Sequence, residues 1–288
     1  MILLCATVGC TAFGRRNPVP EEVDACRELS RQGVAALEMG QWGQAEVLLR
    51  QAISASPNDS QTRRYLAEAL WRRGAADEAL REIEAAVEID RSDASLTVRA
   101  GEMMLAVGDA EQALAHAERA IGMDPKLASA WALRGRVFWQ RNQSDRALAD
   151  LQRALEYAPN SADVLLDLAA LYRQRSQPTR CLTTLHHLLD CYPPGEEPQL
   201  ALLLEGVTLT ELGRPAQAAE SLLAASQRGP RNAEVLYRLA QAQLAAGDAA
   251  TAVATAQQAL AVDGTHEQTR RLVAELAQHA TPTAPTRR

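Results

Sequence analysis

Aromatic side chains are scarce in this sequence: they make up 4% of its 288 residues, whereas 47% of the residues are hydrophobic, mostly alanine and leucine. A chain of this length can bury a large core. Because small aliphatic side chains dominate, we expect helices stacked closely in a row rather than one globular core of large side chains.

Clustered positive charge is also missing. The formal net charge is −6, and the arginines are spread along the chain in pairs such as Arg63–Arg64 and Arg72–Arg73. Binding of nucleic acid needs clusters of lysine and arginine. We therefore expect no nucleic-acid partner and interpret these arginines as a solvated helix face.

The sequence has no glycine-rich phosphate loop and no nucleophile–base arrangement that stands out, so we expect no enzyme and no cofactor. A metal-dependent enzyme is the weaker alternative. His186 and Asp190 are four residues apart, as are His187 and Cys191, so each pair shares a helix face. Two ligands without a third make a weak metal site, and a solvent-facing helix surface explains both pairs.

What the sequence does have is a repeat, which the segment 128–161 shows best. Apolar residues recur at three and four residues in both of its halves, which is the helical period. A break at 142–144 separates the halves. The first half carries Trp131, Leu133, Gly135 and Phe138, and the second carries Ala147, Leu151, Ala154 and Pro159. The pattern predicts a helix–turn–helix hairpin.

Three columns of small residues follow the same spacing. They are Gly33, Ala67, Gly101, Gly135, Ala169, Gly206 and Ala240; Ala45, Ala79, Ala113, Ala147, Cys181, Ala218 and Ala252; and Ala52, Ala86, Ala120, Ala154, Leu188, Ala225 and Ala259. Such columns indicate that two helix axes approach closely. A leucine at Ala147 should therefore overpack the hairpin by roughly 1–3 kcal/mol.

This pattern resembles the tetratricopeptide repeat (TPR) family, whose unit is about 34 residues. The resemblance covers seven units: 26–59, 60–93, 94–127, 128–161, 162–195, 199–232 and 233–266. Glu196, Glu197 and Pro198 form an insertion between units five and six. The resemblance implies an all-α fold, a right-handed α-solenoid (superhelix) of seven hairpins within residues 20–266, plus a C-terminal capping helix at 267–280.

Helix ends follow the repeat too. A residue in the left-handed region is expected at the turn of each hairpin, at Gly40, Gly74, Gly108, Asn142, Ser176, Gly213 and Gly247. Helix N-caps are expected at Asp59, Asp93, Ser161 and Asn232, and at Thr265 for the last helix. Pro20 should start a first helix longer than its counterparts. Residues 281–288 should be a disordered tail.

The cysteines do not suggest a disulfide framework. Cys181 and Cys191 lie ten residues apart in one predicted helix, about 15 Å, which is too far for a disulfide bridge. Cys26 belongs to the first unit. We expect free thiols.

Residues 1–19 are predicted to form a leader. Residues 1–14 are uncharged and too few to span a bilayer as a helix. Val8–Gly9–Cys10 resembles the end of a bacterial lipobox, which predicts lipidation of Cys10 and a membrane-anchored lipoprotein of the cell envelope. A non-lipidated leader and a disordered start are the alternatives; the protein would then be cytoplasmic or periplasmic.

The resemblance places function in a concave groove lined by the first helix of each unit, at unit positions 2, 5, 9 and 12. We predict partner contacts at Arg64, Glu68, Trp71, Glu102, Arg136, Trp139, Arg173, Tyr237 and Gln241. Tryptophan and arginine are the usual anchors of protein–protein contacts. Alternatively, Trp71 and Trp139 pack on the neighbouring first helix. The same positions in unit six are Leu200, Leu203, Val207 and Thr210.

The carboxylate clamp by which some family members hold chaperone tails is missing, because Val34 and Glu68 stand where it needs asparagine. The sequence therefore predicts a non-catalytic scaffold that binds protein or peptide segments in its groove and that the leader ties to a membrane. The alternative is an assembly subunit of an envelope secretion or pilus-type complex.

Overall fold

The computed structural model describes residues 20–280, and of residues 20–23 and 277–280 it describes the backbone alone. The described residues form fifteen helices and no strand, which confirms the all-α fold class. The chain divides into two compact units, called unit one (Met1–Asp109) and unit two (Ala110–Arg288). The seven 34-residue segments of the sequence analysis are called repeats from here on. The predicted leader with Cys10 and the predicted tail 281–288 lie outside the described residues.

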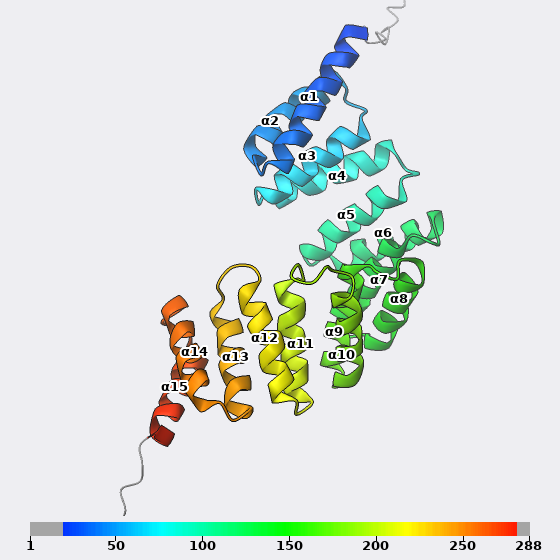
Figure 1. Ribbon diagram of the computed structural model, residues 1–288. Coiled ribbons are helices and arrows are strands. Elements are labelled where there is room, and N and C mark those ends of the chain that lie inside the picture. Colours follow the sequence, from blue (N-terminus) through cyan, green and yellow to red (C-terminus); the bar gives the residue numbers. More distant parts are fainter. Residues whose placement is uncertain (1–19, 281–288) are drawn as a thin grey trace, which may run out of the picture. The chain divides into compact units, whose positions relative to one another are not determined.

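Unit one contains five helices (Figure 1). They are α1 (Pro20–Glu38), α2 (Trp42–Ala55), α3 (Ser60–Arg72), α4 (Ala76–Ile89) and α5 (Ala94–Ala106). α1 packs on α2 and α3 on α4, so each pair is a hairpin, and α2–α3 and α4–α5 contacts join them. α1 has 19 residues against 13 in α3, which confirms the longer first helix.

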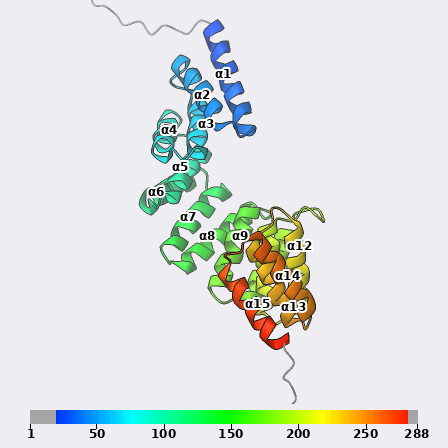
Figure 2. The same cartoon turned by 90° about the vertical axis from the view of Figure 1, so that its left-hand side faces the viewer.

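Unit two contains the other ten helices (Figures 1 and 2). They are α6 (Ala110–Met123), α7 (Ala128–Gln140), α8 (Ser144–Tyr157), α9 (Ala162–Gln174), α10 (Pro178–Leu189), α11 (Gln199–Glu211), α12 (Pro215–Gln227), α13 (Ala233–Ala245), α14 (Ala249–Val262) and α15 (Glu267–Ala280). Four hairpins, α7–α8 to α13–α14, follow α6, and α15 packs on α14 and α13. The boundary between the units falls inside the third predicted repeat, 94–127.

The first two small-residue columns meet in the fourth hairpin, at Gly135 and Ala147. Every residue of the three columns is buried. A Cβ atom on Gly135 would lie 3.3 Å from the carbonyl oxygen of Ala147 and 3.0 Å from Leu151 Cγ. A side chain at position 135 would therefore require Leu151 to shift, which agrees with the small residues of the column.

The hairpin turns have the predicted left-handed residue. All five glycines have positive φ, and so do Asn142 (58°) and Ser176 (54°). Each of these residues ends a first helix in the left-handed conformation. Glycine adopts this conformation freely, whereas Asn142 and Ser176 are strained in it.

The N-caps follow the prediction in part. Asp59 accepts hydrogen bonds from the backbone N–H of Gln61 and Thr62, and Asp93 and Asn232 cap α5 and α13 in the same way. Ser161 occupies the predicted N-cap position of α9, but its side chain makes no capping bond. The prediction for Thr265 is wrong: Thr265 donates to Asp263, and His266 Nδ1 accepts the N–H of Thr269 at 3.3 Å.

The three described cysteines are free, as predicted. Cys26 and Cys181 are buried and Cys191 is exposed. Burial raises the pKa of the Cys26 and Cys181 thiols, which keeps both protonated at neutral pH. None of the helices in the described part of the chain is long and apolar enough to cross a membrane.

Candidate partner-binding surface

The first helices of the hairpins carry the predicted contact residues. We call the surface they form at positions 2, 5, 9 and 12 of each repeat the first-helix face. In unit one it belongs to α1, α3 and α5, and in unit two to α7, α9, α11, α13 and α15. The faces of the two units are described one after the other.

In unit one, Glu68 and Glu102 are bridged by an arginine that the sequence analysis did not select. Arg99 Nη2 lies 2.6 Å from Glu68 Oε2, and Arg99 Nη1 lies 3.1 Å from Glu102 Oε2. Arg72 Nε lies 3.1 Å from the other oxygen of Glu68. Burial raises the pKa of Glu68, but the hydrogen bonds and charges of Arg99 and Arg72 outweigh it, so the pKa lies below its usual value.

Arg64 and Trp71 also have contacts inside unit one. Arg64 Nε donates to Gln61 Oε1 at 3.1 Å, and its guanidinium lies 4.5 Å from the centre of the Tyr65 ring. Trp71 is half-buried and packs against a core cluster that includes Leu96 of α5. That cluster has residues of α3, α4 and α5, and the contact of Trp71 with a partner stays a prediction.

Unit two repeats this arrangement with the charges exchanged. Arg136 Nε on α7 lies 2.5 Å from Asp167 Oδ2 on α9. Burial raises the pKa of Asp167, and Arg136 only partly offsets this. Trp139 donates its indole N–H to Gln174 and packs against the core between α7 and α9. These two predicted anchors therefore hold neighbouring repeats together.

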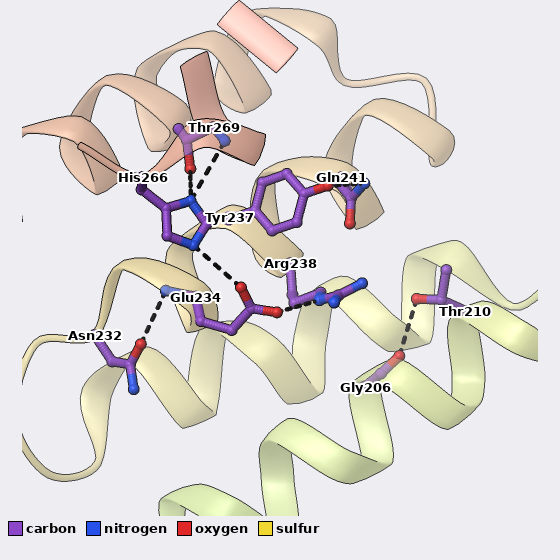
Figure 3. Close-up of polar contacts among 9 residues, drawn as sticks. All are labelled: Gly206, Thr210, Asn232, Glu234, Tyr237, Arg238, Gln241, His266 and Thr269. Atoms are coloured by element: carbon purple, nitrogen blue, oxygen red, sulfur yellow. Dashed lines mark hydrogen bonds and ion pairs between the residues drawn. The ribbon is translucent and has the colours of Figure 1, made fainter. Parts of the chain in front are cut away.

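A polar cluster joins α13 to α15 (Figure 3). Gln241 donates to the Tyr237 hydroxyl at 2.7 Å, and the Tyr237 ring lies 5.4 Å from the His266 ring. His266 Nε2 lies 3.2 Å from Glu234, whose other oxygen accepts from Arg238 Nε at 2.6 Å. Because His266 Nδ1 accepts the Thr269 N–H, the ring proton belongs on Nε2, facing the carboxylate.

Among the predicted contact residues, Arg173 is exposed, and its guanidinium makes no hydrogen bond or ion pair with another described residue. The first helix of the following repeat, α11, has an apolar surface that was not among the predicted partner contacts. Leu200 on α11 is 54% exposed and Leu244 on α13 is 36% exposed. Leu166, Leu203 and Val207 at equivalent positions are half-buried.

The sequence contains a signal for this surface. α11 reads QLALLLEGVTLTE, in which the apolar residues are spread around the helix and not confined to one side. A helix with that pattern is normally covered on all sides.

The two histidines considered as the start of a metal site each contact a different residue. His186 lies 3.1 Å from Glu205, and His187 lies 3.2 Å from Asn160. Across residues 24–276, no three His, Cys, Asp or Glu side chains are grouped to hold a metal ion.

The fold and the face described here define an all-α protein built from repeated helical hairpins. Two sequence models of the tetratricopeptide repeat match the chain, one at residues 36–97 and 138–205 and the other at 104–150 and 203–266. The chain belongs to the tetratricopeptide repeat family.

Solved structures of this family are similar to the chain. PilF of Pseudomonas aeruginosa is 18% identical with a TM-score of 0.58, and the match covers 88% of this chain and 99% of PilF. PilW, described as a type IV pilus biogenesis factor, is 17% identical with a TM-score of 0.62, covering 70% and 93%. YrrB, described as a TPR protein with an unusual peptide-binding site, is 19% identical with a TM-score of 0.56, covering 66% and 96%. Comparison with curated proteins gives no match.

Proposed function

We propose that this protein is a non-catalytic scaffold whose first-helix face binds segments of partner proteins. One observation carries the proposal: α11 and α13 expose Leu200 and Leu244 on that face. Each square ångström of apolar surface removed from water stabilises a complex by about 25 cal/mol. A partner that covers these leucines gains that free energy, and exposed apolar patches mark such surfaces.

The surroundings of the leucines indicate the kind of segment that fits. Leu200, Leu203 and Val207 follow one another along α11, while Arg173 on α9 offers an unpaired guanidinium. A segment with apolar side chains and an acidic residue for Arg173 complements this surface. The predicted contacts remain part of the proposal: Arg64, Glu68, Trp71 and Glu102 for unit one, and Arg136, Trp139, Arg173, Tyr237 and Gln241 for unit two.

Site-specific photo-crosslinking in cells tests this proposal. A photoreactive amino acid at position 200 or 244 is expected to crosslink to a partner protein. The matched control is position 223, because Leu223 is 48% exposed but lies on the second helix α12.

Leu200→Asp should abolish the crosslink from position 244, and Leu223→Asp should leave it unchanged. Both variants should unfold at the same temperature as the unaltered protein, because both side chains are exposed. Equal crosslinking from positions 200 and 223 would contradict the assignment of this face.

A second candidate is an assembly subunit of an envelope secretion or pilus-type complex, tethered through a lipid on Cys10. PilF and PilW support it, although at 17–18% identity they share the fold alone. Cell fractionation with palmitate labelling tests the tether: the label should enter the unaltered protein and be lost in Cys10→Ala. An unlabelled, unsedimented protein rules out the lipid anchor, and mass spectrometry of crosslinked partners identifies the complex.

A further inference from the structure

A cavity of about 360 Å³ lies between α12, α13 and α14 in unit two. Ser226 of α12 and Gln258 of α14 line it, together with Arg231 and Asn232 from the loop before α13. Both α12 and α14 are second helices, so this cavity is not part of the first-helix face. Its volume is near the lower end of the range of ligand pockets, about 300–1,000 Å³.

The cavity has a cause in the repeat pattern. Ser226 stands at position 28 of the sixth repeat, where the other six repeats have Ile53, Val87, Ile121, Leu155, Leu189 and Leu260. The sixth repeat alone therefore lacks a branched aliphatic side chain at this position. The missing group leaves space above Leu236, whose side chain is almost fully buried.

The lining combines an apolar floor with hydrogen-bond donors. Leu236, Ala261 and Val262 provide the apolar part. Arg231 and Gln258 are exposed, and neither side chain makes a hydrogen bond or ion pair with another described residue. No acidic residue of the described chain is among those that line the cavity. The lining thus offers an uncompensated positive charge beside space for a small apolar group.

The loop that carries Arg231 is fixed by residues outside the cavity. Gln199 Nε2 donates to the carbonyl oxygens of Ala225 at 2.9 Å and Pro230 at 3.2 Å. Arg228 forms an ion pair with Glu197 at 3.3 Å. Glu197 belongs to the three-residue insertion that only this junction has. A loop held in this way loses less conformational entropy when a ligand binds.

We propose that this cavity binds a carboxylate that carries a short branched aliphatic group, as a free acid or as the C-terminal residue of a polypeptide. The carboxylate accepts hydrogen bonds from Arg231 and Gln258, since a guanidinium is the side chain best suited to a carboxylate. The aliphatic group occupies the space beside Ser226 and packs on Leu236, Ala261 and Val262. This site is independent of the first-helix face and of the function proposed for it.

Saturation-transfer NMR on the full chain tests the proposal with N-acetyl-L-valine as the probe and its uncharged amide as the matched ligand. Titration of the signal is expected to show that the acid binds at least about fivefold more tightly than the amide, corresponding to roughly 1 kcal/mol. Arg231→Gln should reduce the acid signal to that of the amide. Ser226→Leu, which restores the side chain usual in the repeat, should do the same. Arg81→Gln, an exposed arginine of α4, should leave the signal unchanged.

Circular dichroism confirms that each variant is folded. A short peptide that ends in valine, compared as free acid and as amide, distinguishes the two sources of the ligand. Binding of the peptide alone points to a polypeptide terminus, and binding of both probes shows that the free acid is sufficient. Equal signals from acid and amide, a signal that persists in Arg231→Gln, or no signal from either probe would overturn the proposal.

Discussion

Gly206 of α11 lies against Leu222 of α12 so closely that a Cβ atom at position 206 would be 2.4 Å from Leu222 Cγ. The same pair of repeat positions holds Gly33 and Leu49 in the first hairpin, where the distance would be 2.6 Å. Three of the four hairpins that have leucine at this position of the second helix have glycine opposite it, at Gly33, Gly135 and Gly206, whereas the hairpin with Leu185 has Ala169 there.

Gly206→Ala should therefore destabilise the fold. We expect the free energy of unfolding to fall by about 1–3 kcal/mol, because the added methyl group must displace Leu222. Gly122→Ala on α6 is the control, since a Cβ there meets nothing within 4 Å. It should raise the free energy of unfolding by up to about 1 kcal/mol through helix propensity. Urea unfolding measures both, and equal stability of Gly206→Ala and the unaltered protein would disprove the contact.

The ion pair between Arg134 and Asp150 should contribute to stability. Arg134 donates from Nε and Nη2 to the two Asp150 oxygens at 2.8 and 2.9 Å, and Asp150 is 6% exposed. Asp150→Ala should lower the free energy of unfolding by roughly 1–3 kcal/mol, because a largely buried guanidinium loses its partner. Asp145→Ala on the same helix removes an exposed carboxylate paired with Arg175 and should cost at most about 1 kcal/mol. Equal losses in urea unfolding would show that burial of the pair does not matter.

Ser176→Gly should stabilise the turn between α9 and α10. Ser176 has φ of 54°, a conformation that costs a residue with a Cβ atom about 1–2 kcal/mol. After the larger unfolded-state entropy of glycine is subtracted, we expect a gain of up to about 1 kcal/mol. Gly213→Ala, at the same repeat position with φ of 70°, should show the opposite sign. Thermal unfolding that moves the same way in both variants would refute the argument.

Gln243→Leu should stabilise unit two. Gln243 stands at the repeat position of Leu70, Phe138, Tyr172 and Leu209, and its Oε1 atom is buried without a hydrogen bond. Leucine removes the unsatisfied acceptor and fills the same space, for a gain of about 1–2 kcal/mol. Gln241→Leu should bring no gain, because Gln241 already bonds the Tyr237 hydroxyl. A lower unfolding temperature for Gln243→Leu would mean that this oxygen has a partner in solution.

Glu68 should make the stability of unit one depend on acid. Its pKa in the folded chain lies below the ordinary value of 4.5, so the unfolded chain binds the proton more readily. The stabilisation is therefore present above pH 4.5 and is lost as the pH falls through the folded pKa. Glu68→Gln should lower stability at neutral pH and flatten the acid limb of the stability curve. Asp167 has a raised pKa, so Asp167→Asn should not flatten that limb. An unchanged acid limb in Glu68→Gln would contradict the low pKa.

Periodicity was sufficient to place the helices and their turns, because a 34-residue repeat fixes both the buried side and the left-handed residue. It also led to the capping roles of Asp59, Asp93 and Asn232. It failed at Thr265, since the choice between two adjacent polar residues depends on the exact end of α14 and on Glu234, which lies one repeat away.

Contacts between repeats were harder to foresee. The bond from Arg99 to Glu68 spans 31 positions, and so does that from Arg136 to Asp167. Such a spacing is visible in a sequence only when the offset between neighbouring first helices is known. The boundary between the two compact units is equally hidden, because Gly101 and Ala113 continue the repeat pattern across it.

The paired charges of the first-helix face have a kinetic consequence. Glu68, Asp167 and Glu234 each pair with an arginine of a first helix, so these charges contribute little field to attract a partner from a distance. Encounter without such steering proceeds at roughly 10⁵–10⁶ M⁻¹ s⁻¹. Apart from the contribution of Arg173, capture by this protein should therefore be slow and should change little with ionic strength, and selectivity should reside in how long a bound segment stays.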